Sequence, residues 1–231
     1  MLLRVRSEDP RERAQALAAV AAVYWQPVFR HVRARWRLSG PEAEDAAQGF
    51  FAAALEKGWL ERFDPARGRF RSYLLACLDG HVSHERRAAA ARKRGGGATF
   101  VPLEATGPDG EARELPLRAG CDLDAVFQRE WARSVFTLAL AALEARCAGA
   151  GRQVAFAVFR RCDVEGAEAD ERPSYARLAE EFGLSVAQVT NHLHGVRREL
   201  RVVVLDTLRE ITAGEQEFRA EARALLGVDP P

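Results

Sequence analysis

The chain of 231 residues has no long apolar run, little lysine, and only four cysteines, none of them in a CxxC pair. A helix that spans a bilayer needs about 20 consecutive apolar residues. The short run ALAAVAAVYW follows charged residues and precedes no cleavage site, so it predicts an amphipathic helix and no signal peptide. The widely spaced cysteines argue against a disulfide scaffold or a zinc ribbon and favour a reducing compartment. We therefore expect a cytoplasmic protein that makes no contact with a membrane.

Enzyme motifs are missing too: the sequence has no GxSxG, P-loop or HExxH pattern. Two weaker constellations remain. Asp45 with Glu42 or Asp79 could form a carboxylate pair, but surface carboxylates are common. Three potential metal ligands follow a helical spacing of i, i+4 and i+7, without a fourth ligand or a CxxC pair: Cys77, His81 and His84. We expect no catalytic site, no bound metal and no cofactor.

Charge is distributed unevenly along the chain. The net charge is only +1, but residues 1–97 hold 18 Lys and Arg against 11 Asp and Glu, and residues 98–231 hold 16 against 22. The basic half ends in the cluster ERRAAAARKRGGG. Such asymmetry between halves points to a polyanionic partner, although a solvated face has the same appearance.

Glycine and proline mark the organisation of the chain. Gly95–Gly97 opens a turn-rich stretch with little helical periodicity, which predicts a linker. No alternating pattern is long enough for a sheet, so the predicted fold is all-α, with two small helical domains joined by a flexible linker. The expected parts are a first domain at 1–97, the linker at 98–121, a second domain at 122–205 and a C-terminal helical extension at 206–231.

Helix starts are signalled by capping boxes. Ser39-Gly-Pro-Glu42 opens a helix expected to run to about Lys57, and Ser185-Val-Ala-Gln188 and Thr212-Ala-Gly-Glu215 repeat the pattern. The first of these helices carries one broad apolar stripe: Ala46, Ala47, Phe50, Phe51, Ala54 and Leu55. After a turn at 64–69, another helix is expected to begin near Phe70 and to run into the basic cluster.

The stretch SYARLAEEFGLSVAQVTNHLHGVRREL, residues 174–200, predicts two helices joined at Gly183, which suits the left-handed residue that ends a helix. The second helix is expected to bury Val189, Leu193, Val196 and Leu200. Its opposite side is polar and free of carboxylates until Glu199. This pattern is typical of a helix-turn-helix, whose second helix enters the major groove of DNA, and also of an αα-corner in a helical bundle.

The polar side of this second helix has the chemistry of a DNA reader. Asn and Gln pair with adenine edges, Thr contacts bases, and Arg holds phosphates. The candidate DNA-contacting residues are Gln188, Thr190, Asn191, His192, His194, Arg197 and Arg198.

The two halves together resemble the extracytoplasmic-function (ECF) sigma factors, the small two-domain members of the sigma-70 family. The segments YWQPVFRHVRARW and AEDAAQGFFAAALEKGWLERFDPARGRFRSYLLACL, with the basic tail, are similar to the family's promoter-melting domain. The stretch 174–200 is similar to the domain that reads the −35 element. Order and spacing agree over about residues 10–205, and the form of the motifs is similar to a subgroup with a long linker and an extended C-terminus.

The resemblance implies roles for individual residues. The helix at 41–57 would dock on the clamp helices of the polymerase's largest subunit through Asp45, Gln48 and Ala52. The following loop and helix would capture an unstacked base of the −10 element and follow the DNA backbone, with Phe63 either lining the base pocket or filling the core. The residues expected in this −10 set are Phe63, Arg69, Gly80, His81, His84, Arg86, Arg87, Arg92, Lys93 and Arg94.

The sequence departs from the family at Gly80, where asparagine is common; His81 or His84 then becomes the expected donor to the captured base. The implied function is promoter recognition and melting by a sigma factor, with core RNA polymerase (its clamp helices and the flap of its second-largest subunit) and promoter DNA as partners. The resemblance also allows an anti-sigma factor, which nothing in the chain identifies. The alternative is a stand-alone helix-turn-helix regulator that does not recruit polymerase.

Overall fold

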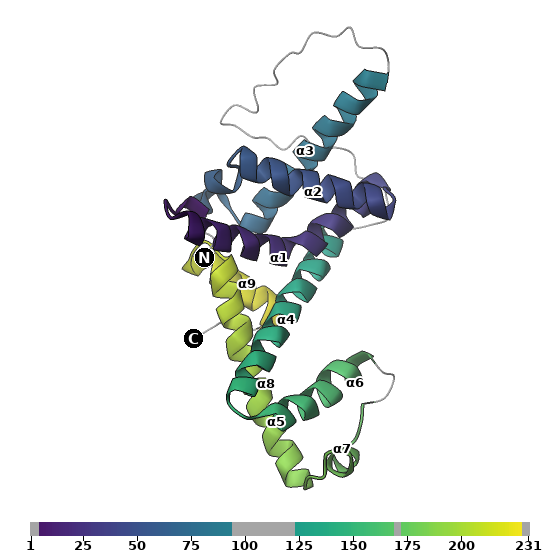
Figure 1. The fold of residues 1–231 in the computed structure, drawn as a ribbon, viewed down its shortest axis with the longest axis vertical. Coiled ribbons are helices and arrows are strands. Elements are labelled where there is room, and N and C mark those ends of the chain that lie inside the picture. The colour runs from purple at the N-terminus through teal and green to yellow at the C-terminus, as the bar shows by residue number, and fades with distance from the viewer. Residues whose placement is uncertain (1–4, 94–122, 169–171, 228–231) are drawn as a thin grey trace. The chain divides into compact units, whose positions relative to one another are not determined.

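The computed structural model describes residues 5–93, 123–168 and 172–227, and the predicted linker lies outside this part of the chain. The described residues are helical and contain no strand, which confirms the all-α prediction (Figure 1). Contacts divide the chain into two compact units, residues 1–131 and residues 132–231. Each unit is described by itself below.

The first unit is built on α1 (Pro10–Trp36), α2 (Gly40–Glu56) and α3 (Phe70–Lys93). α2 packs on α1 and on α3. The Ser39 capping box is present as predicted, with the Glu42 carboxylate accepting from the Ser39 backbone. α3 begins at Phe70 as expected, after the 3₁₀ turns Leu60–Arg62 and Pro65–Arg67. These helices bring the apolar side of α2 against the core.

The core of this unit is aromatic. Phe50 is completely buried and Phe51 is 9% exposed, as the apolar stripe of α2 predicted, and Phe70 on α3 is completely buried too. Leu55 was counted in that stripe but is 49% exposed, because the stripe drifts around the helix and its last member leaves the core. A buried histidine contacts this core from α1: the Nε2 atom of His31 lies 2.9 Å from a carboxylate oxygen of the partly exposed Asp79 on α3.

α4 (Leu123–Gly149) crosses the boundary between the two units. Its first turns belong to the first unit. The Phe127 ring is buried and stacks 6.4 Å from Tyr24, and the Arg71 guanidinium lies 4.6 Å from the centre of the Trp131 ring. These aromatic contacts place the beginning of α4 within the first unit's core.

The second unit contains the rest of α4, α5 (Gln153–Phe159), a π-helical turn at Arg160–Val164, α6 (Glu165–Glu168), α7 (Tyr175–Phe182), α8 (Val186–Ile211) and α9 (Glu215–Leu226). α8 is the central element, since α5, α7 and α9 all pack on it (Figure 1). Its buried side includes Val189, Leu193 and Val196, as predicted, whereas Leu200 is only partly buried.

The connection between α7 and α8 follows the sequence closely. Gly183 takes the left-handed conformation at φ 66° and ends α7, and its amide donates to the carbonyl of Ala179. The Ser185 capping box then opens α8, with Gln188 as its partner. Three residues therefore suffice to turn the chain between the two helices.

The third predicted capping box is wrong. The N-cap of α9 is Gly214, which has no side chain to cap with. Thr212 instead ends α8, and its hydroxyl donates to the Leu208 carbonyl at 2.8 Å. Glu217 rather than Glu215 accepts from the loop, through the amide of Ala213. A threonine hydroxyl that donates to a carbonyl of its own helix is not available to cap the next helix.

Two glycines, one at this connection and one inside α8, allow a matched test of backbone conformation. We expect Gly183→Ala to destabilise the protein by about 1–2 kcal/mol, because alanine is strained in the left-handed region. Gly195 lies inside α8, where an added Cβ would meet nothing within 4 Å. Gly195→Ala is therefore expected to stabilise by about 0.5–1 kcal/mol. Urea denaturation of both variants measures these opposite signs, and equal signs would contradict the assigned conformations.

Candidate nucleic-acid interface

The outer side of α8 is the first candidate surface. Six of the predicted DNA-contacting residues are exposed along it, and His192 is half-buried. The exposed residues are Gln188, Thr190, Asn191, His194, Arg197 and Arg198. Because Val189, Leu193 and Val196 hold the opposite side in the core, the orientation of this face is fixed by packing.

Three of these residues, Gln188, Thr190 and Arg197, already form hydrogen bonds within the protein. The side-chain oxygen of Gln188 accepts from the Ser185 amide at 2.8 Å. The Thr190 hydroxyl donates to the Val186 carbonyl at 2.9 Å. Side-chain groups that already form hydrogen bonds within the helix are less available to bind base edges than the sequence pattern indicates.

Arg197 has a partner within the protein that the sequence analysis did not expect. Its guanidinium donates to both carboxylate oxygens of Asp163, at 2.7 and 2.9 Å, and this hydrogen bonding raises the pKa of Arg197 above its ordinary value. Asp163 lies in the π-helical turn after α5, so the pair ties that turn to α8. The structure thus gives Arg197 an internal ion pair, and its phosphate contact stays a prediction. Arg198 remains as an exposed cation beside it.

The predicted −10 residues gather on α3 and on the loop before it. Arg69, Gly80, His84, Arg86 and Arg87 are exposed, and His81 is half-buried. Arg92 and Lys93 lie in the last turn of α3, but their side chains, like the whole of Arg94, fall outside the described residues. Exposed arginines along one helix give a surface that attracts phosphates.

Phe63 does not face solvent. Its ring is 4% exposed, and its centre lies 5.2 Å from that of Phe70 in an edge-to-face contact and 5.4 Å from that of Tyr73. The Arg6 guanidinium also donates to the Phe63 carbonyl. Of the two roles considered for this residue, the structure gives it the one in the core, and a base would not reach the ring without unpacking it.

An aromatic residue that the sequence analysis missed lies close by. Trp59 is half-buried after the end of α2, and its ring centre is 5.7 Å from that of His81 on α3. Burial lowers the pKa of His81 below its ordinary value. The only signal in the sequence is the position of Trp59 directly after Gly58, which has φ 62° just past the end of α2.

The predicted polymerase-docking residues share one side of α2. Asp45, Gln48 and Ala52 are all exposed, while Ala47, Phe50 and Phe51 hold the other side in the core. This spacing of three and four residues places the three side chains in one row. The row is therefore open to a partner, as it would also be in an ordinary solvated helix.

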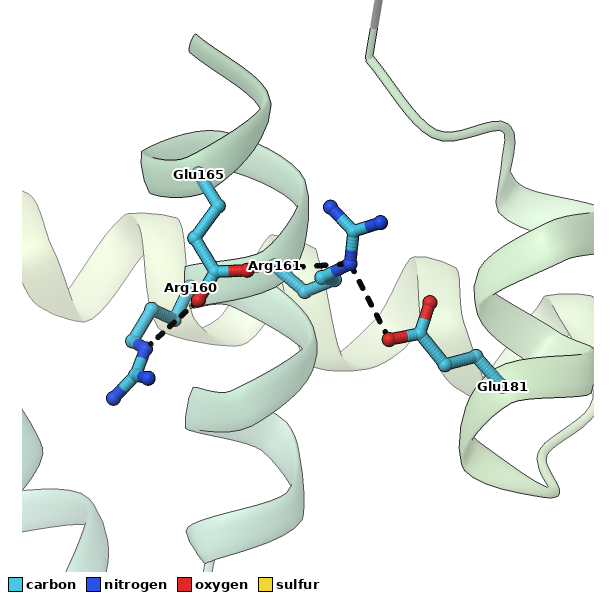
Figure 2. Close-up of polar contacts among 4 residues, drawn as sticks. All are labelled: Arg160, Arg161, Glu165 and Glu181. Carbon is cyan, nitrogen blue, oxygen red and sulfur yellow. Dashed lines mark hydrogen bonds and ion pairs between the residues drawn. The ribbon is translucent and has the colours of Figure 1, made fainter. Parts of the chain in front are cut away.

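A cavity of about 420 Å³ lies in the second unit between α4, α5, the π-helical turn and α7. Its lining includes Arg160, Arg161, Glu165 and Glu181, and Figure 2 shows the polar contacts among these charged residues. The Nε atom of Arg161 lies 3.3 Å from Glu181 on α7, and the Nε atom of Arg160 lies 3.2 Å from Glu165. The Arg161–Glu181 pair joins the π-helical turn to α7, whereas the Arg160–Glu165 pair is local; each gives a modest gain because the side chains are partly exposed.

Among the residues that the structure describes, no group of three or more His, Cys, Asp and Glu side chains is arranged to hold a metal ion. Cys77, His81 and His84 are thus not brought together as a ligand set, and burial raises the pKa of the Cys77 thiol. Within the described ranges, no helix has the length and apolar character needed to cross a bilayer.

Comparison with known proteins adds no relative: no family model matches the chain, and no curated protein or solved structure shows significant similarity to it.

Proposed function

We propose that this chain is an RNA polymerase sigma factor of the ECF type, which binds core polymerase, directs it to promoters and helps to melt the −10 element. In this proposal the second unit contains a helix-turn-helix, formed by α7 and α8, that reads the −35 element. The first unit docks on polymerase and opens the DNA, and residues 98–121 connect the two as a flexible linker. The protein works in the bacterial cytoplasm, at the nucleoid.

The outer face of α8 carries the proposal. It is a capped helix after a three-residue turn, with its apolar side fixed in the core and a polar side free of exposed carboxylates from Gln188 to Arg198. With Gln188, Thr190 and Arg197 engaged internally, base contacts are left mainly to Asn191 and His194, and phosphate contact to Arg198. Asparagine recognises adenine through two hydrogen bonds, while arginine at a phosphate sets the register.

The first unit favours a sigma factor over a regulator that acts alone. Its α2 offers the exposed row Asp45, Gln48 and Ala52 beside a basic helix, α3. A stand-alone regulator needs the outer face of α8 but has no use for that row. Core binding through α2 therefore separates the two functions.

Size-exclusion chromatography with bacterial core RNA polymerase tests the proposal. We expect the wild-type protein to co-elute with core enzyme and Asp45→Arg to weaken the complex about tenfold or more, because the charge reversal places a cation at a site adapted to an acid. Gln48→Ala is expected to have a smaller effect in the same direction. Glu210→Arg, the same reversal at an exposed position of α8, is the control and should co-elute normally.

A folded wild-type protein that does not bind core enzyme at moderate salt would contradict the sigma function and favour the stand-alone regulator. Equal binding by Asp45→Arg and Glu210→Arg would keep the sigma function but remove the docking role from α2.

A further inference from the structure

We infer that Asp163 is a specificity-determining residue of the second unit, because it occupies the phosphate-binding side of Arg197 and so restrains binding to DNA of any sequence. We call the ion pair of these two residues the Asp163 latch. The inference rests on the proposed contact between the outer face of α8 and DNA, and it deepens that proposal. Asp163 itself lies outside the predicted helix-turn-helix, 34 residues before its partner.

The latch engages every nitrogen of the Arg197 guanidinium. Its Nε and Nη2 atoms donate to the two carboxylate oxygens of Asp163 at 2.7 and 2.9 Å, and its Nη1 atom lies 3.5 Å from the hydroxyl oxygen of Tyr175. Arginine binds a phosphate in the same way, through two parallel N–H groups that meet two oxygens. A DNA phosphate therefore competes with Asp163 for the same donors.

Arg197 lies on the candidate DNA face. It is exposed and follows His194 by three residues, so the two side chains share one row of α8. Phosphate contacts carry no sequence information, whereas contacts to base edges do. A free arginine in this row would raise the affinity for all DNA, while base contacts by Asn191 and His194 would be unchanged. Holding Arg197 on a carboxylate thus increases the ratio of specific to non-specific binding.

The carboxylate is presented by an irregular element. Asp163 belongs to the π-helical turn Arg160–Val164, in which the Glu165 amide donates to the Arg160 carbonyl five residues earlier. Cys162, the preceding residue, is 3% exposed and fixes the turn in the core. Departures of this kind from the α-helical path are uncommon and occur frequently at functional sites. Here the departure supplies an acidic partner to a helix whose own outer face has none.

The exposure of the pair suits a contact that DNA can open. The side chain of Asp163 is 19% exposed and that of Arg197 is 44% exposed. A fully buried pair would be very costly to separate, because each charge would lose its partner in a medium of low polarity. A partly exposed pair is held less strongly. The phosphates of a correctly docked site can then displace the carboxylate, whereas a transient encounter with other DNA does not.

Binding of the full-length protein to a short fluorescein-labelled duplex of random sequence tests the latch. Fluorescence anisotropy is measured at several salt concentrations. Asp163→Asn keeps the shape of the side chain but removes the charge that holds Arg197. We expect binding to become tighter by about two- to tenfold, and the slope of log K against log salt to become steeper by about 0.9, the value for one added phosphate contact.

Asp206→Asn is the matched control. Asp206 pairs with Arg146 at 2.9 Å, so this variant also removes one carboxylate charge and releases one arginine. The released arginine lies on α4, away from the DNA-reading row, and we expect the salt slope to stay as in the wild type. In an Arg197→Gln background, Asp163→Asn is expected to have no effect on binding, whereas a general effect of the lost negative charge would persist.

The latch is overturned if Asp163→Asn and Asp206→Asn bind with the same affinity and salt slope, or if the gain survives in the Arg197→Gln background. Loss of thermal stability in Asp163→Asn without a change in binding would leave the pair a structural role and overturn the latch too. Absence of duplex binding by Asp163→Asn at low salt has the same consequence.

Co-elution with core polymerase, measured for the same variants, reports on the sigma function separately. Asp163 lies in the second unit and the proposed docking row lies on α2 of the first, so we expect Asp163→Asn to co-elute as the wild type does. If the wild-type protein does not bind core enzyme, the sigma function fails, and the comparison on duplex DNA still decides the latch. If core binding is normal and the duplex comparison shows no difference, the latch fails and the sigma function stands.

Discussion

Phe50→Ala is expected to lower the free energy of unfolding by about 3–5 kcal/mol, the range for truncating a buried phenylalanine. Phe50 is completely buried and contacts three aromatic or imidazole rings, those of Phe51, Trp59 and His81, at 5.4–6.1 Å between ring centres. Alanine would remove these contacts and leave a cavity between α2 and α3. A loss of this size is a large part of the total stability of a typical domain.

Tryptophan fluorescence during urea denaturation is a suitable measurement, because all four tryptophans of the chain lie within residues 1–131. The signal therefore reports on the first unit. Leu55→Ala is the matched control from the same helix: Leu55 is 49% exposed, so we expect a change within about 0.5 kcal/mol. Similar losses for the two variants would contradict the packing of α2 described above.

Sequence reasoning succeeded where the physics is local. The Ser39 and Ser185 capping boxes and the left-handed Gly183 depend on residues no more than a few positions apart, and the structure contains all three. The apolar spacing of α8 likewise predicted Val189, Leu193 and Val196 as buried. Local hydrogen bonds and helical periodicity leave few alternatives to such patterns.

The failed capping box at Thr212 has a local cause, but the other features that the sequence did not settle have non-local causes. The partner of Arg197 is Asp163, 34 residues away in a π-helical turn that no pattern indicated. Phe63 lies in a loop, where there is no period to show which side is buried, and its burial depends on Phe70 and Tyr73. Trp59 was missed for the same reason. Which aromatic side chain of an irregular segment enters the core is decided by tertiary packing.

The proposed function of α8 depends on which of its sides faces the core, and one substitution tests that orientation with a large effect. We expect Leu193→Ala to lower the free energy of unfolding by about 2–5 kcal/mol, because Leu193 is 1% exposed and alanine would leave a cavity in the second unit. Far-UV circular dichroism during urea denaturation measures the loss.

His194→Ala, one position further along α8, is the control. His194 is exposed, so its truncation should change stability by no more than about 0.5 kcal/mol. Consecutive residues on a helix point about 100° apart, so a one-residue error in the assigned register would make the two variants alike or reverse their order. That result would also move Asn191 and Arg198 away from the surface, and the proposed reading of DNA by α8 would fail with them. The predicted order instead keeps those two side chains on the open side, where a major groove can receive them.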